Sequence, residues 1–186
     1  MYLLILGLIL FHGLHSIRML APEWRQARID AMGEGPWKGI YSLATLLALV
    51  VIVFGYRSAD PASLWAPPVW GRHLAILLIL IAFVLMPFNL RSSRLAPITH
   101  HPFLLAMILW SGGHLLANGE ARAVLLFGSF FVWAIWNLTQ VRKRADPLPP
   151  RAPLWQDALA MMIGVAIWLL FLLIAHQWLF GVSPLA

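Results

Sequence analysis

The sequence contains no cysteine and few charged residues. Asp, Glu, Lys and Arg together make up 11% of its 186 residues. The first absence excludes a disulfide framework and thiolate chemistry, and it leaves the redox compartment undefined. The seven acidic residues lie between the long apolar runs or at their ends, so a buried carboxylate acid–base pair is not expected. The sequence also has no phosphate-binding loop and no Ser-His-Asp pattern.

Apolar residues are present in excess. They make up 61% of the chain, and the mean hydropathy is +0.82, which is too apolar for a soluble domain of ordinary composition. We therefore predict an all-α integral membrane protein, a bundle of about six transmembrane helices in the lipid bilayer. The apolar segments are 2–17, 39–56, 73–88, 102–118, 121–138 and 158–180.

These segments use nearly the whole chain, which predicts a single integral membrane domain, residues 1–186. Proline-rich stretches at 60–68 and 146–153 are expected to connect helices, and Asn118-Gly119 predicts a tight link between the fourth and fifth segments. The first segment has no basic flank before it and no small-residue cleavage site after it. It is therefore expected to be a retained helix and not a signal peptide.

The positions of the basic residues predict the orientation. Loops one, three and five hold most of the 13 Lys and Arg residues, so the positive-inside rule places these loops in the cytoplasm and both termini outside, as in a bacterial inner membrane. The loops explain the net charge of +6, so nucleic-acid binding is not needed to account for it. The basic residues of these loops are Arg18, Arg25, Arg28, Lys38, Arg91, Arg94, Arg142, Lys143, Arg144 and Arg151; the others are Arg57, Arg72 and Arg122.

Chemistry within the spans depends mainly on histidine. The first segment carries His12 and His15 three residues apart, and Arg18 extends that stripe by one turn. Near the end of the last segment, His176 is expected to be interfacial. The remaining histidines are His73, His100 and His101, which begin segments and are open to an interfacial or a ligand role, and His114, which is expected to lie within the membrane.

The stretch WSGGHLLANGE, residues 110–120, is unusual for a membrane helix. Glycine costs about 1 kcal/mol relative to alanine in a helix, and an ionisable side chain at bilayer depth is costly. Trp110, His114 and Asn118 follow a four-residue spacing and should share one stripe. Gly112 and Gly113 leave the adjoining faces of the helix without side chains. That space could serve close packing of another helix, or it could accommodate a flat ring, since histidines from two helices can bind a haem between them.

Several runs resemble one known family. They are FHGLHSIR (11–18), GEGPWKGIYSL (33–43), RHLAILLILIAFVL (72–85), THHP (99–102) and GHLLANGEARAVLLFGSF (113–130). These runs resemble NnrU proteins, membrane proteins associated with nitrogen-oxide respiration, and the resemblance covers most of the chain. It implies a membrane protein linked to denitrification.

The family is similar, more distantly, to a plant zeta-carotene cis-trans isomerase, a membrane enzyme that holds haem b with histidines. This resemblance implies haem b as the cofactor and His114 as one axial ligand. The first-helix ligand matches less directly, because Phe11 aligns with it; His15, on the same face, is the predicted ligand and His12 a near-equal alternative. Further alternative ligands are His73 and His101, and the remaining cofactor-binding candidates are Trp110, Gly112, Gly113 and Asn118.

Three functions from different classes follow. The first is a haem b protein of nitrogen-oxide metabolism that passes electrons to a redox partner or senses redox state, which a reduced-minus-oxidised spectrum tests. The second is a cis-trans isomerase acting on an apolar polyene such as a carotene, which activity on a cis-carotene tests. The third is a non-enzymatic assembly factor for metal or haem, which weak, exchangeable metal binding would distinguish.

Overall fold

The computed structural model describes residues 1–90, 101–144 and 153–185. Over these ranges the chain is helical and forms no β-strand; a single isolated bridge joins Ser63 and Glu120. The all-α fold class is thus confirmed. The predicted basic residues at 91, 94 and 151 and the first two residues of the THHP run, Thr99 and His100, lie outside the described residues.

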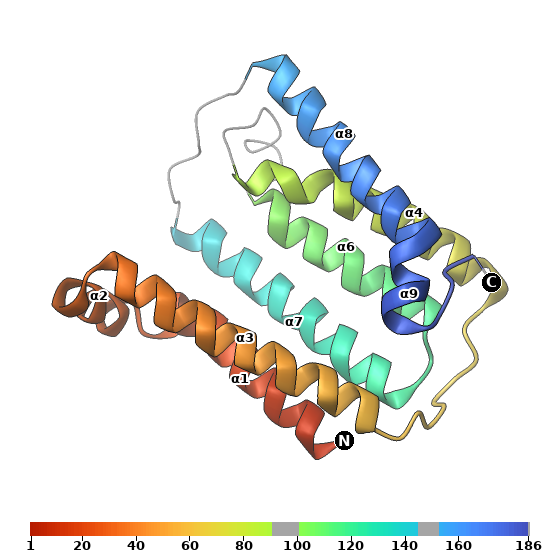
Figure 1. The fold of residues 1–186 in the computed structure, drawn as a ribbon, viewed down its shortest axis with the longest axis horizontal. Helices are drawn as coiled ribbons and strands as arrows, with labels where there is room; N and C mark the ends of the chain where they lie inside the picture. Colours follow the sequence, from red (N-terminus) through yellow and green to blue (C-terminus); the bar gives the residue numbers. More distant parts are fainter. Residues whose placement is uncertain (91–100, 145–152, 186) are drawn as a thin grey trace. The chain divides into compact units, whose positions relative to one another are not determined.

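Figure 1 shows the helices of the described residues. In order they are α1 (Tyr2–Leu20), α2 (Pro22–Met32), α3 (Glu34–Ser58), α4 (Val69–Leu85), the 3₁₀ turn η1 (Met86–Leu90), α6 (Pro102–Ala117), α7 (Ala121–Arg144), α8 (Leu154–Leu170), the π-helical turn η2 (Phe171–Ala175) and α9 (His176–Phe180). The six predicted apolar segments are helical along their lengths, except that Asn118 lies just beyond the end of α6, and two of them continue from an α-helix into a 3₁₀ or π-helical turn. The short link at Asn118-Gly119 is also confirmed, because α6 ends at Ala117 and α7 begins at Ala121.

Five helical segments are long and apolar enough to cross a membrane. Within the described part of the chain they are Tyr2–Leu20, Glu34–Ser58, Val69–Phe88, Ala121–Lys143 and Leu154–Phe180. The remaining predicted span, the fourth, is α6, which is also apolar but has only 16 residues. A helix near 20 residues long spans the hydrocarbon core, so α6 is short for a complete crossing.

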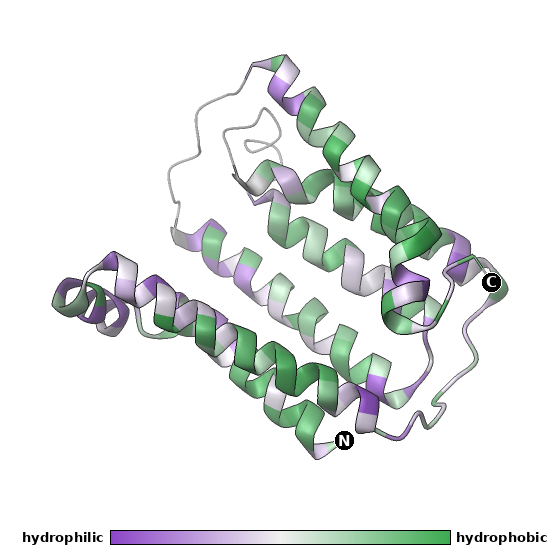
Figure 2. Ribbon diagram, viewed as in Figure 1, coloured by the Kyte–Doolittle hydropathy of each residue, from purple (hydrophilic) through white to green (hydrophobic). Residues whose placement is uncertain are grey.

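Large apolar side chains are exposed along the helices. Leu46 is 57% exposed, Phe54 62% and Met162 61%, and Figure 2 shows hydrophobic residues along most of α3 and α8. Exposure of such an apolar surface to water is unfavourable, whereas its contact with lipid chains is favourable. The protein is therefore an integral membrane protein.

Helix α2 is an addition to the sequence-based prediction, which assigned its residues to the first inner loop. It is short and mostly hydrophilic (Figure 2), and none of its residues is buried. Pro22 occupies a first-turn position, where a missing backbone N–H costs nothing. Gly33 ends the helix with φ 86°, a left-handed conformation that suits glycine.

The described chain forms two compact units. Unit 1 comprises Met1–Leu64 and Glu120–Ser129. In it, α1 lies beside α3 (Figure 1), with Leu4, Leu8 and Ile52 buried. At Gly7 the two helices approach so closely that a Cβ atom would lie 2.8 Å from the backbone nitrogen of Ile52.

Unit 2 comprises Trp65–Gly119 and Phe130–Ala186. Its helix α4 packs against both α6 and α8. A core of Ala82, Leu85 and Ala106 lies where α4 meets α6. Gly164 lets α8 approach the backbone of α4 at Phe83, in the manner of small residues at membrane helix contacts.

Candidate functional site

The stripe predicted on α6 is present. The ring nitrogen Nδ1 of His114 donates a hydrogen bond to the Trp110 carbonyl over 2.8 Å, and Asn118 Nδ2 donates to the His114 carbonyl over 2.7 Å. The Trp110 and His114 rings are 4.9 Å apart between centroids. Because a carbonyl oxygen only accepts, the neutral His114 ring carries its proton on Nδ1 and its lone pair on Nε2.

The same arrangement occurs at His15 on α1, in unit 1. Its Nδ1 donates to the Phe11 carbonyl over 2.8 Å, and the two rings are stacked with centroids 4.1 Å apart. Tyr41 of α3 meets the edge of the His15 ring, with centroids 5.6 Å apart. His15 and His114 thus each follow an aromatic residue by four positions and present Nε2 as the ring nitrogen able to bind a metal.

His12 has the opposite tautomer. Its Nε2 lies 3.1 Å from the Ser129 hydroxyl oxygen, and that hydroxyl donates its hydrogen to the Leu126 carbonyl over 2.8 Å. Since a hydroxyl has one hydrogen, His12 Nε2 is the donor to Ser129, and the lone pair of the neutral ring lies on Nδ1. That atom is buried within the protein. His15 is therefore the better candidate for a metal ligand on the first helix.

The two other alternative ligands have different surroundings. His101 caps α6, and its Nδ1 accepts a hydrogen bond from the Leu104 backbone N–H over 3.3 Å. His73 is exposed in the second turn of α4. His101 thus has a structural role at a helix start, and His73 lies on the surface of its unit.

The two glycines before His114 have protein neighbours on their open faces. A Cβ atom at Gly113 would lie 3.2 Å from Ile79 Cγ1 and 3.3 Å from the Ala75 carbonyl oxygen, both on α4. A Cβ atom at Gly112 would lie 3.3 Å from the Phe131 ring. The structure thus favours close helix packing over macrocycle clearance as the reason for this pair.

The last helix of unit 2, α9, begins at His176. His176, in unit 2, donates from Nδ1 to the Val182 carbonyl over 2.7 Å and lies edge-on to Phe180.

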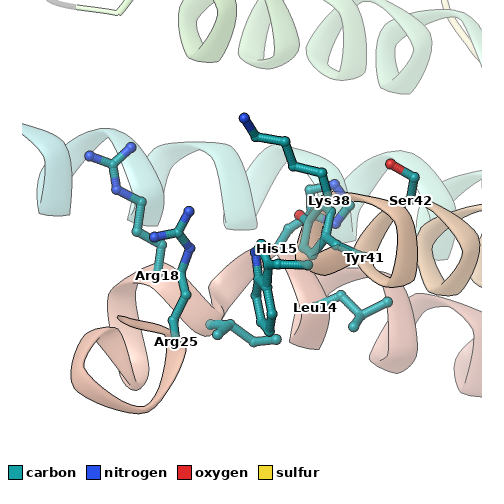
Figure 3. Close-up of a pocket in the computed structure, with 9 residues that line it drawn as sticks. Leu14, His15, Arg18, Arg25, Lys38, Tyr41 and Ser42 are labelled. Atoms are coloured by element: carbon teal, nitrogen blue, oxygen red, sulfur yellow. The ribbon is translucent and has the colours of Figure 1, made fainter. Parts of the chain in front are cut away.

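A basic pocket in unit 1 was also missed by the sequence-based analysis. It has a volume of about 320 Å³ and brings together residues from α1, α2 and α3 around His15 (Figure 3). Its lining residues are Leu14, His15, Ile17, Arg18, Arg25, Trp37, Lys38, Tyr41 and Ser42. The stripe from His15 to Arg18 was the only part of this pocket that the sequence indicated.

Among residues 1–90, 101–144 and 153–185, no group of three or more His, Asp or Glu side chains could hold a bare metal ion. The candidate ligands are His12 and His15 on α1 and His114 on α6, and each is fixed by a backbone carbonyl or a hydroxyl. Such residues suit a cofactor that brings most of its own ligands to the metal.

The fold and these residues define a class: a helical membrane protein whose spans carry histidines oriented by backbone hydrogen bonds. The model of the NnrU protein family matches residues 3–184, and the chain belongs to that family. Comparisons with curated proteins and with solved structures gave no match. The more distant resemblance to the plant isomerase therefore stays a prediction.

Proposed function

We propose that this NnrU-family protein is an integral membrane haem b protein of nitrogen-oxide metabolism, in which His114 and His15 would hold the haem. Family membership suggests the link to denitrification. The observation that carries the haem assignment is the shared geometry of the two histidines, each with Nδ1–H bound to a carbonyl at 2.8 Å.

That geometry is typical of metal-binding histidine. A ligating imidazole almost always donates its second ring N–H to a carbonyl or carboxylate, which fixes the tautomer, orients the ring and raises the basicity of the ligating nitrogen. For His15 and His114 the hydrogen bond comes from the preceding turn of the same helix. Each ring is therefore set by local helix geometry before any cofactor binds.

The aromatic neighbours limit the movement of both rings. The stacked Phe11 ring restricts His15 on one side, and Trp110 lies against His114. Asn118 holds the His114 carbonyl at the end of α6. When bound, haem b would supply a one-electron redox couple, and His114 and His15 would hold it.

Histidine replacements test this proposal. We would purify the wild type, His114→Ala, His15→Ala and His73→Ala from cells supplied with haem and measure absorbance per mole of monodisperse protein. The His114 and His15 variants should lose pigment or change its spin state, whereas His73→Ala should match the wild type because that ring is exposed. Equal pigment in all four proteins would contradict the ligand assignment.

A fifth protein, His12→Ala, is measured in the same way. Because His12 Nε2 donates to Ser129, its replacement should lower stability and leave the spectrum of the folded protein unchanged. If His12→Ala loses pigment and His15→Ala does not, His12 is the ligand and His15 has the structural role.

A further inference from the structure

Helix α2 joins two membrane spans at their ends. Both α1 and α3 are long and apolar enough to cross a membrane, and a single residue, Ala21 or Gly33, links each of them to α2. α2 thus lies at one end of the pair formed by α1 and α3 (Figure 1). Its 11 residues extend over about 16 Å. Links this short hold α2 at the level where the two spans leave the lipid.

The side chains of α2 divide into one half-buried face and two exposed flanks. Arg25 and Ile29 are half-buried and form the face toward the rest of unit 1. With 3.6 residues per turn, the exposed residues on either side of that face separate by chemistry. The tryptophan flank consists of Trp24, Arg28, Ala31 and Met32, and the acidic flank consists of Glu23, Gln26 and Asp30. The two flanks therefore suit different surroundings.

A row of aromatic rings places the tryptophan flank on the membrane side of α2. The Trp24 ring lies edge-on to Trp37, with centroids 5.9 Å apart, and Trp37 stacks with Tyr41 at 6.4 Å. Since α3 begins at Glu34, Trp37 and Tyr41 follow that span inward from its end. Trp24 is still 51% exposed. Tryptophan and tyrosine rings in this position are typical of the boundary between lipid and water.

The charges of α2 are separated in the same sense. Arg28 shares its flank with apolar residues, where its hydrocarbon stem can cover apolar surface while its guanidinium stays among polar headgroups. The carboxylates of Glu23 and Asp30 lie on the other flank, and Asp30 accepts a hydrogen bond from exposed Gln26 over 2.8 Å. Anionic lipids attract arginine and repel carboxylates. The charges thus match lipid along one flank and water along the other.

We infer that α2 lies in the plane of the membrane surface, with the tryptophan flank at the boundary between headgroups and acyl chains and the acidic flank in water. The lipid-facing surfaces of both spans extend to the ends next to α2, because Leu20 is 69% exposed and Ile40 59%. Helices that lie on a membrane bury one apolar flank at this depth. The inference does not depend on the proposed function, and its test needs no haem.

Spin labels on the full-length protein test the inference. Because the chain has no cysteine, each variant carries a single labelling site. Arg28→Cys labels the tryptophan flank and Gln26→Cys the acidic flank, and these exposed positions lie on nearly opposite sides of the helix. The labelled proteins are placed in vesicles of phosphatidylethanolamine and phosphatidylglycerol.

Electron paramagnetic resonance then measures collisions of each label with oxygen, which concentrates in lipid, and with a nickel chelate, which stays in water. The ratio of oxygen to chelate collisions should be higher for the label at residue 28 than for the label at residue 26. If Arg28→Cys does not give monodisperse protein, Met32→Cys labels the same flank.

A second comparison tests Trp24 as the anchor of this flank. Trp24→Ala, added to Arg28→Cys, should lower the collision ratio at residue 28 toward the value at residue 26. The matched control is Trp178→Ala in the same labelled protein, which removes a tryptophan that is 81% exposed on α9 of unit 2. This control should leave the ratio at residue 28 unchanged.

Equal ratios at residues 26 and 28, or a higher ratio at residue 26, would overturn the inference. So would a label at residue 28 that is protected from both probes, because the tryptophan flank would then be covered by protein, such as a second copy of the chain. A ratio at residue 28 that Trp24→Ala leaves unchanged, or that Trp178→Ala lowers equally, would overturn the role of Trp24 as the anchor.

Discussion

Two glycines of α1 provide a test of the packing that holds His15 in place. At Gly7 a Cβ atom would lie 2.8 Å from the Ile52 backbone nitrogen and 2.9 Å from Ile52 Cγ1, whereas at Gly13 nothing lies within 4 Å. Replacement by alanine gains about 1 kcal/mol of helix propensity at either position. At Gly7 it also overpacks the contact with α3, which costs about 1–3 kcal/mol because backbone atoms cannot rotate away.

The two variants should therefore differ in the free energy of unfolding by about 1–3 kcal/mol, with Gly7→Ala the less stable. For a chain of this size, 1 kcal/mol corresponds to a shift in melting temperature of about 2–4 °C. Thermal unfolding in one detergent, followed by far-ultraviolet circular dichroism, should place Gly7→Ala about 2–12 °C below Gly13→Ala. Equal melting temperatures would refute the close approach of α1 and α3.

Three further predictions concern orientation, ligand choice and the glycine before His114. A reporter fused after residue 186 should be external, and one inserted at 142–151 should be cytoplasmic; the reverse pattern would contradict the assigned topology. His176→Ala should leave pigment content unchanged, and a loss of pigment would make His176 a ligand. Gly113→Leu should lower the yield of folded protein because α4 occupies that face, while Gly128→Leu, with open space around it, should not; pigment per mole of folded protein should stay the same in both.

The spans were predictable because they depend on local properties of the sequence. Long apolar runs located every predicted helix, and Pro102 marked the start of α6. Helix α2 was missed because its residues are polar and its length is only 11 residues, so neither hydropathy nor periodicity distinguishes it from a loop. Its proline and its terminal Gly33 were the available signals.

The site was predictable only where it depends on spacing along one helix. The four-residue intervals of α6 placed Trp110, His114 and Asn118 in contact, as the structure shows. The contact of His12 with Ser129 joins residues 117 positions apart, and no local pattern encodes it. The basic pocket depends in the same way on three helices meeting.

The central claim is that the chain holds a haem between histidines, and the absorbance spectrum of the wild type tests it most directly. The measurement is a reduced-minus-oxidised spectrum of monodisperse protein purified from haem-supplemented cells. The account predicts a haem b spectrum of the low-spin type given by two histidine ligands. It also predicts conversion to a high-spin spectrum, or loss of pigment, when His114 is replaced. A wild type that carries no haem, or a spectrum that His114→Ala leaves unchanged, would contradict it.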